Sequence, residues 1–84
     1  MNKINWSNKA LKQLRKLNKP DQNTIWDAVG ELGTMPSSRN VKALANHEHQ
    51  YRLRVGNYRV LFDFDGTLHI IQIEEVRKRD ERTY

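Results

Sequence analysis

Two tight-turn signals in the second half of the chain restrict the fold more than any other feature of the sequence. Gly56-Asn57 and Asp65-Gly66 separate segments rich in valine, isoleucine, tyrosine and phenylalanine. Glycine beside asparagine or aspartate is typical of two-residue β-hairpin turns. We therefore predict three consecutive antiparallel strands, over Tyr51–Val55, Tyr58–Phe64 and Thr67–Val76.

Two-residue turns also fix which residues face one another across the strands. The first turn places Arg54 opposite Arg59. The second turn places Arg59 opposite Gln72. It also places His69 opposite Phe62, in a row that faces the core. Side chains alternate between the two faces of a sheet, so one face is predicted to be apolar. That face would carry Tyr51, Leu53, Val55, Tyr58, Val60, Phe62, Ile71 and Ile73. The open face would carry Arg52, Arg54, Arg59 and Gln72, with Leu61 and Ile70 as an apolar floor.

The first part of the chain is predicted to be helical after a short strand, Lys3–Trp6. Ser7 can cap a helix with apolar residues at helical spacing. These residues are Ala10, Leu11, Leu14 and Leu17. Pro20 suits the first turn of a second helix, which Gly33 is expected to end. A helical hairpin packed on the apolar face of the sheet predicts an α+β fold, with a single domain over residues 1–84.

The predicted pairing of Arg54 with Arg59 is the most informative feature of the open face. Like charges directly opposite each other destabilise a β-ladder, so a sheet selected for stability alone would tend to avoid them. Arg52 adds a third guanidinium nearby. Guanidinium groups bind phosphate through paired hydrogen bonds, which predicts a phosphate-binding surface. The alternative is a solvated basic face with acidic neighbours such as Asp63 or Glu74.

The C-terminal residues are almost wholly charged and leave the third predicted strand beside this surface. They include Arg77, Lys78, Arg79, Arg82 and Tyr84. We expect them to extend or cover the basic surface. An ordinary charged terminus is the alternative.

Other candidate sites are weaker. His47-Glu48-His49 offers two imidazoles but no third ligand at a recognisable spacing, so we predict no metal site and no cofactor. Glu74 and Glu75 are expected to point to opposite faces of the sheet, which excludes an acid–base pair. Nucleotide-binding loops and nucleophile motifs are absent from the sequence.

Charge and composition narrow the classes of partner. The chain of 84 residues has 15 basic and 10 acidic side chains, a net charge of +5, which favours nucleic acid or an acidic protein segment as partner. It contains no cysteine, which excludes disulfides. No apolar run approaches the roughly 18 residues of a membrane span, and the N-terminus has no signal-peptide pattern. We expect a cytoplasmic protein that does not contact membranes.

The whole pattern resembles the RelE/ParE superfamily of bacterial toxins from toxin–antitoxin systems. The most specific stretch is Tyr51–Phe62, and Ile71–Tyr84 is similar to the C-terminal signature of the family. The helix around residues 10–17 fits as well. The resemblance implies a microbial ribonuclease fold, in which a helical hairpin packs on a curved antiparallel β-sheet.

The resemblance also implies an activity. RelE-type members bind the ribosomal A site and cut mRNA there, and a cognate antitoxin inhibits them. Matching positions implies a metal-independent endoribonuclease with catalytic roles for Arg54, Arg59, Arg79 and Tyr84. Residues that would bind RNA are Arg52, Arg77, Lys78 and Arg82. RelE itself has lysines where Arg52 and Arg54 stand, and its spacing between the last two catalytic positions differs by one residue.

Two other functions stay open at this point. A ParE-like toxin inhibits gyrase without cleaving RNA, although the ParE branch generally lacks the full basic set. An inactive member would only pair with its antitoxin and repress their operon.

Overall fold

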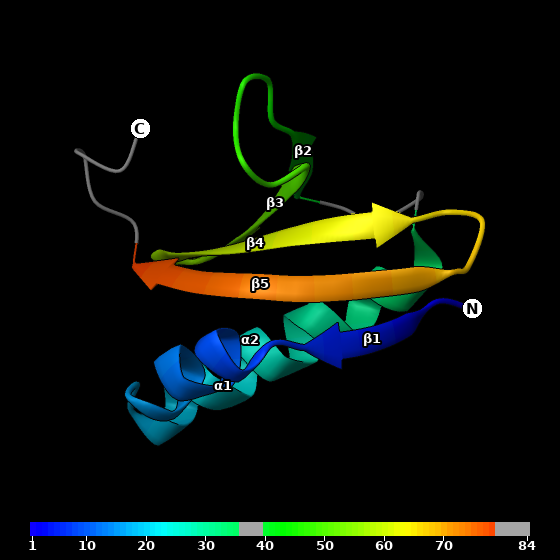
Figure 1. Cartoon of the computed structure of the whole chain (residues 1–84). Coiled ribbons are helices and arrows are strands. Elements are labelled where there is room, and N and C mark those ends of the chain that lie inside the picture. The colour runs from blue at the N-terminus through cyan, green and yellow to red at the C-terminus, as the bar shows by residue number, and fades with distance from the viewer. Residues whose placement is uncertain (36–39, 79–84) are drawn as a thin grey trace.

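Two helices cover one face of a five-stranded sheet in the computed structural model, which describes residues 1–35 and 40–78 (Figure 1). The strands lie in the order β1-β5-β4-β3-β2; neighbours are antiparallel, except that β1 runs parallel to β5. The elements are β1 (Lys3–Trp6), α1 (Asn8–Arg15), α2 (Lys19–Gly30), β2 (Val41–Ala43), β3 (Tyr51–Val55), β4 (Tyr58–Asp65) and β5 (Ile70–Lys78). This arrangement confirms the predicted α+β class.

Both helices begin where the sequence predicts. The Ser7 side chain accepts a hydrogen bond from the Ala10 N–H at 3.0 Å, and Asn18 caps α2 in the same way, with Pro20 in its first turn. The α-helix ends at Gly30 and continues as a short 3₁₀ turn, Glu31–Thr34, which contains the predicted terminator Gly33. No helix in the described ranges is long and apolar enough to cross a membrane.

The core lies between the helices and the predicted apolar face of the sheet. The helices contribute mainly Leu14, Ile25, Val29 and Leu32, all buried. The strands contribute Leu53, Val55, Val60, Phe62, Ile71, Ile73 and Val76. Tyr58 closes one edge, where its hydroxyl donates a 2.8 Å hydrogen bond to Asp21 at the start of α2. That bond, together with some desolvation, raises the pKa of Tyr58 above its ordinary value.

The first hairpin confirms its predicted register, but the second does not. Arg54 pairs with Arg59 across a turn in which Gly56 has a φ of 55°, as a two-residue turn with glycine in first position needs. The prediction of a two-residue turn at Asp65-Gly66 is wrong. Asp65 instead accepts hydrogen bonds from the N–H groups of Thr67 and Leu68, which builds a four-residue loop.

The longer loop moves every partner on β5. Asp65 pairs with Ile70 and Phe62 with Ile73, whereas the sequence analysis placed His69 opposite Phe62. His69 is therefore exposed in the loop with a φ of 56°, and its predicted place in the core-facing row is wrong.

A β-bulge at Glu74 shifts the register once more. Leu61 pairs with Glu75 and Phe62 with Ile73, so Glu74 has no partner on β4. The extra residue keeps both Ile73 and Val76 on the core face. It leaves Glu74 and Glu75 together on the open face, as two-against-one pairing at a bulge allows. The predicted orientation of these carboxylates to opposite faces is wrong for this reason.

Side chains at helix α1 bind the backbone of β5 beyond the point where its pairing with β1 ends. The pairing of β1 with β5 stops at Trp6 and Ile73. Beyond that point, the Ser7 hydroxyl donates a 3.0 Å hydrogen bond to the carbonyl of Glu74, and the Gln13 side chain accepts one of 2.7 Å from the Val76 N–H. The side chains of Ser7 and Gln13 thus bind the Glu74 carbonyl and the Val76 N–H. These two backbone groups lie on either side of Glu75, beyond the end of the pairing with β1.

We predict that Ser7→Ala lowers the free energy of unfolding by about 1–2 kcal/mol, the usual effect of removing a helix N-cap. The loss should lie at the upper end of that range because the same hydroxyl also contacts β5. Denaturant unfolding measures it. The matched control is Asn8→Ala at the exposed next position, which should change stability by less than about 0.5 kcal/mol. Equal effects of the two substitutions would contradict the assignment.

Candidate phosphate-binding surface

Three arginines form one row across the open face of the sheet, from β3 to β5. Arg54 pairs with Arg59, and Arg59 pairs with Arg77. Directly opposed residues on antiparallel strands have Cα atoms about 4.5–5.5 Å apart. The row therefore brings three guanidinium groups within reach of one phosphate or of two neighbouring ones. The sequence analysis placed Gln72 opposite Arg59, and the corrected register replaces this neutral side chain with a cation.

The other predicted RNA-binding residues lie at different places. Arg52 is one row away from the three arginines, opposite Leu61, which in turn pairs with Glu75. Lys78 is opposite Tyr58 and lines a depression with Asp21 on the helix-covered face. The geometry thus groups Arg52 with the row and separates Lys78 from it. The remaining predicted site residues, Arg79, Arg82 and Tyr84, lie outside the described residues.

Glu75 is a buried carboxylate that binds two of the basic side chains next to the open face. Its side chain is only 5% exposed, yet it contacts two cations: Lys9 at 3.1 Å and Arg77 at 3.0 Å. Arg77 donates to both carboxylate oxygens, from Nη2, and also from Nε to one of them. Burial by itself would raise the pKa of Glu75, but hydrogen bonds from Lys9 and Arg77 outweigh it and lower the pKa below the ordinary value.

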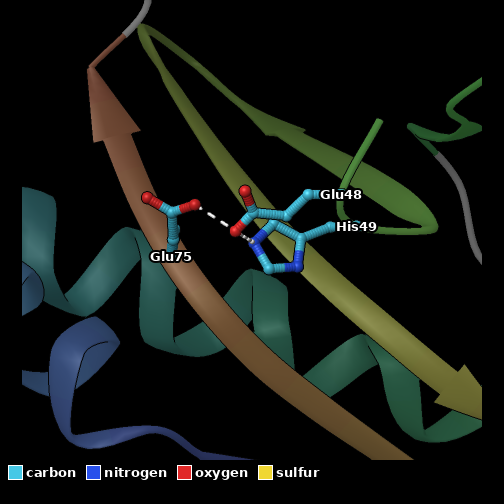
Figure 2. Close-up of side chains that lie close together, drawn as sticks. All are labelled: Glu48, His49 and Glu75. Atoms are coloured by element: carbon cyan, nitrogen blue, oxygen red, sulfur yellow. Dashed lines mark hydrogen bonds and ion pairs between the residues drawn. The ribbon is translucent and has the colours of Figure 1, made fainter. Parts of the chain in front are cut away.

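The loop between β2 and β3 brings a histidine onto the same face. This loop rises on the side of the sheet opposite the helices (Figure 1). His49 is buried there, with its Nε2 3.1 Å from Glu75 and 3.3 Å from the exposed Glu48 (Figure 2). The sequence analysis missed this contact, because nothing in the spacing of the chain links the loop to β5.

Glu74 has a different environment from Glu75. Partial desolvation, and then the neighbouring Asp63 carboxylate, raise the pKa of Glu74 above its ordinary value, while His49 opposes the shift. The bulge therefore presents two adjacent carboxyl groups with opposite pKa shifts on one face. The acidic neighbours considered in the sequence analysis do exist, but the carboxylate that binds Arg77 of the arginine row is Glu75.

Comparison with protein families matches residues 4–83 to the model described as ParE toxin of type II toxin–antitoxin system, parDE. The match covers nearly the whole chain. The chain belongs to this toxin family. Comparison with curated protein sequences gives no match.

Solved structures of related toxins share the fold of this toxin. It is 25% identical to a chain of the RelBE2 toxin–antitoxin complex from Mycobacterium tuberculosis, with a TM-score of 0.80 over 93% of this chain and 98% of that one. A chain of the archaeal RelE–RelB complex from Pyrococcus horikoshii is 22% identical, with a TM-score of 0.81 over 95% and 97%. The isolated Escherichia coli RelE toxin is 16% identical, with a TM-score of 0.79 over 99% and 89%. These matches confirm the predicted RelE/ParE resemblance.

We predict that Glu75→Gln lowers the free energy of unfolding of the toxin by about 1–2 kcal/mol at neutral pH, since it removes a charged acceptor from Lys9 and Arg77. The folded-state pKa of Glu75 lies below its ordinary value, so this stabilisation is present above the unfolded-state pKa of about 4.3. It is lost as the pH falls through the lowered folded-state pKa.

Denaturant unfolding at several pH values tests this expectation. The difference between wild type and variant should shrink as the solution becomes more acidic. Glu48→Gln, which neutralises an exposed carboxylate of the same loop region, is the control and should change little. A difference that stays constant down to strongly acidic pH would show that the charge of Glu75 does not stabilise the toxin.

Proposed function

We propose that this toxin is a ribosome-dependent endoribonuclease that cuts mRNA in the A site and thereby inhibits translation. The observation that carries the proposal is the row of Arg54, Arg59 and Arg77, one of which is held in place by a buried carboxylate. Such a row suits the charge of an RNA phosphate. Like charges directly opposite each other cost stability, which supports selection of this row for binding an anion.

The proposed reaction needs no metal ion. The 2′-oxygen of a ribose attacks the neighbouring phosphorus as its proton passes to a base. The bond from phosphorus to the 5′-oxygen then breaks, and an acid protonates the leaving oxygen. Cationic hydrogen-bond donors lower the barrier by stabilising the added negative charge of the five-coordinate phosphorane. We assign this role to Arg54, Arg59 and Arg79.

Proton transfer requires a different kind of residue. Arginine stays protonated in proteins and cannot easily act as the base. We propose that Tyr84 exchanges a proton or stacks on a nucleobase of the mRNA. Arg52 would position the mRNA or assist protonation of the leaving oxygen. Further RNA contacts would come from Arg77, Lys78 and Arg82. A free phenol titrates near 10, so it would need neighbouring cations to work as a base. We expect the ribosome to align the substrate, which supplies the entropic part of catalysis.

We further propose that an antitoxin protein is the physiological partner. Two of the similar structures are toxin–antitoxin complexes, RelBE2 from Mycobacterium tuberculosis and RelBE from Escherichia coli. The net charge of +5 favours an acidic or amphipathic segment of such a partner.

Gyrase inhibition without RNA cleavage is the second candidate function. The family match itself favours it, because the matching model describes ParE toxins. Under this proposal the arginine row would contact gyrase or its DNA, and substitutions in the row would alter DNA breakage rather than mRNA.

Primer extension on translating ribosomes separates the two functions, and Arg59→Ala tests the site. We predict new mRNA ends at the A-site codon with wild-type toxin and none with the variant. Removing Arg59 relieves repulsion from Arg54 and Arg77, so stability should hold or rise slightly. Arg15→Ala, an exposed cation at the end of α1, is the matched control and should keep cleaving.

The outcomes differ clearly. Intact mRNA with DNA breakage in the wild type would replace the first proposal with the second. Full cleavage by a folded Arg59→Ala variant would contradict the site assignment. An unfolded variant would show that Arg59 is structural.

We predict that Tyr84→Phe slows cleavage far more than it weakens ribosome binding. Binding to ribosomal RNA is spread over many lysines and arginines, whereas general acid–base groups typically contribute about 10²–10⁴-fold to rate. Phenylalanine keeps the ring for stacking but loses the hydroxyl. Single-turnover cleavage on programmed ribosomes, with binding measured in parallel, separates the two roles. Equal rates for the two proteins would mean that the residue only stacks and that the base lies elsewhere.

A further inference from the structure

The Nδ1 atom of His49 is buried without a hydrogen-bond partner in a polar part of the open face. The side chain is 9% exposed, and Nδ1 is among the buried side-chain atoms that make no hydrogen bond. Buried polar atoms are nearly always satisfied, so an exception calls for a physical explanation. Figure 2 shows that this nitrogen faces away from both Glu48 and Glu75.

Two carboxylates lie close to this ring, and one of them, Asp63, faces Nδ1. The ligand atoms of His49, Asp63 and Glu74 all lie within 4.8 Å of one another. Asp63 uses Oδ1 to accept a 2.8 Å hydrogen bond from the Gln50 N–H, which leaves its Oδ2 3.5 Å from His49 Nδ1. Glu74 is there because the β5 bulge turns it to this face. Three elements thus converge: the β2–β3 loop, β4 and β5.

The opposite side of the ring offers an acceptor to the other ring nitrogen, Nε2. His49 Nε2 lies 3.1 Å from Oε2 of the buried Glu75, which can only accept while it is ionised. A neutral imidazole that donates from Nε2 has a lone pair on Nδ1. That lone pair then faces Oδ2 of Asp63, which is also electron-rich, with the Glu74 carboxylate close by. A cation between them would be bound by an imidazole nitrogen and two carboxylates at once.

We propose that His49 Nδ1, Asp63 and Glu74 form a Zn²⁺ site that fastens the β2–β3 loop to the sheet. Zn²⁺ binds imidazole nitrogen and carboxylate oxygen at about 2.0–2.2 Å, usually as a tetrahedron. Two ligands of such a tetrahedron are about 3.4 Å apart, by geometry from those bond lengths. The 3.5 Å from Nδ1 to Asp63 Oδ2 fits this value, but it is long for a hydrogen bond.

Glu75 would support the zinc ligand His49 by binding its other ring nitrogen. Zinc-bound histidines almost always donate their other ring N–H to a carboxylate or carbonyl, which fixes the ring and raises its basicity as a ligand. The bond from His49 Nε2 to Glu75 has this form. With three protein ligands, the fourth position of the tetrahedron would hold water.

The neighbouring cluster of Glu48, His49 and Glu75 is a poorer cation site, although its ligand atoms are equally close. Glu75 already contacts the ammonium group of Lys9 and the guanidinium of Arg77. A divalent ion there would be repelled by both. Among the described residues, ion pairs with lysine or arginine are found for Glu75 but not for Asp63 or Glu74, so the charge of these two carboxylates is available to the metal.

Isothermal titration of the purified full-length toxin with ZnCl₂ tests the proposal. We expect one equivalent to bind to the wild type, and Glu74→Gln to weaken binding by at least about tenfold, since it removes a ligand. Glu48→Gln is the matched control, because it neutralises the carboxylate of the competing cluster and should leave the affinity unchanged. Titration with Co²⁺, which occupies the same tetrahedral sites, should give visible absorption bands of a tetrahedral ion.

Further measurements keep the test independent of folding and of toxicity. Saturating Zn²⁺ should raise the Tm of the wild type and of Glu48→Gln, but not that of Glu74→Gln. His49→Gln should abolish the response, and circular dichroism will show whether that variant is folded. Absence of one-equivalent binding would overturn the proposal, as would Zn²⁺ binding that survives Glu74→Gln or is lost in Glu48→Gln. Neither result bears on mRNA cleavage.

Discussion

The extra residue at Glu74 in β5 determines how the open face of the sheet is arranged. If β5 kept Glu74 but had no bulge, regular alternation from Ile73 would turn Glu75 to the core face and Val76 to the open face. With the bulge, Val76 remains buried, while Glu75 and Arg77 both point to the open face. Backbone groups at the bulge also bind side chains at the first helix: the Glu74 carbonyl binds Ser7, and the Val76 N–H binds Gln13. The bulge therefore affects three features together: the contacts with the first helix, the arginine row, and the cluster of His49, Asp63 and Glu74.

Electrostatics explains why the row needs a buried carboxylate beside it. Two unit charges about 5 Å apart repel by about 3 kcal/mol at an effective dielectric constant near 20, and by less than about 1 kcal/mol in water. Arg54 is exposed, so its repulsion is well screened, but Arg59 and Arg77 are half-buried. Glu75 offsets the repulsion by binding Arg77 through both oxygens. Lys9, which lies on α1, in turn forms an ion pair with the buried Glu75 carboxylate.

How far the sequence predicts the structure depends on whether the signals are local. The cap at Ser7, the Gly56-Asn57 turn and the Arg54–Arg59 pairing were all predictable, because each depends on residues close in the chain. The second hairpin was not, since the Asp65 side chain stabilises a longer loop than its dipeptide suggests.

The candidate site shows the same limit. The open face and two members of its arginine row follow from the alternation of β3 and β4. The third member, Arg77, depends on a bulge that has no sequence signature, and was expected in a charged tail. The contact of His49 with Glu75 joins residues 26 positions apart through tertiary structure alone. A periodicity argument can assign side chains to faces, but it cannot place a loop residue over a strand.

Under the proposed function, the arginines of the row would meet an anion in two different ways. Arg77 uses Nε and Nη2 to bind Glu75, and a guanidinium has further N–H donors on Nη1. Glu75 thus fixes the orientation of Arg77 while leaving donors for a phosphate, which reduces the entropy lost on binding. Arg54 has no carboxylate partner among the residues that the structure describes. It can follow a phosphate that arrives in more than one position. A fixed donor beside an adaptable one would suit the proposed mRNA substrate, which we expect the ribosome to align.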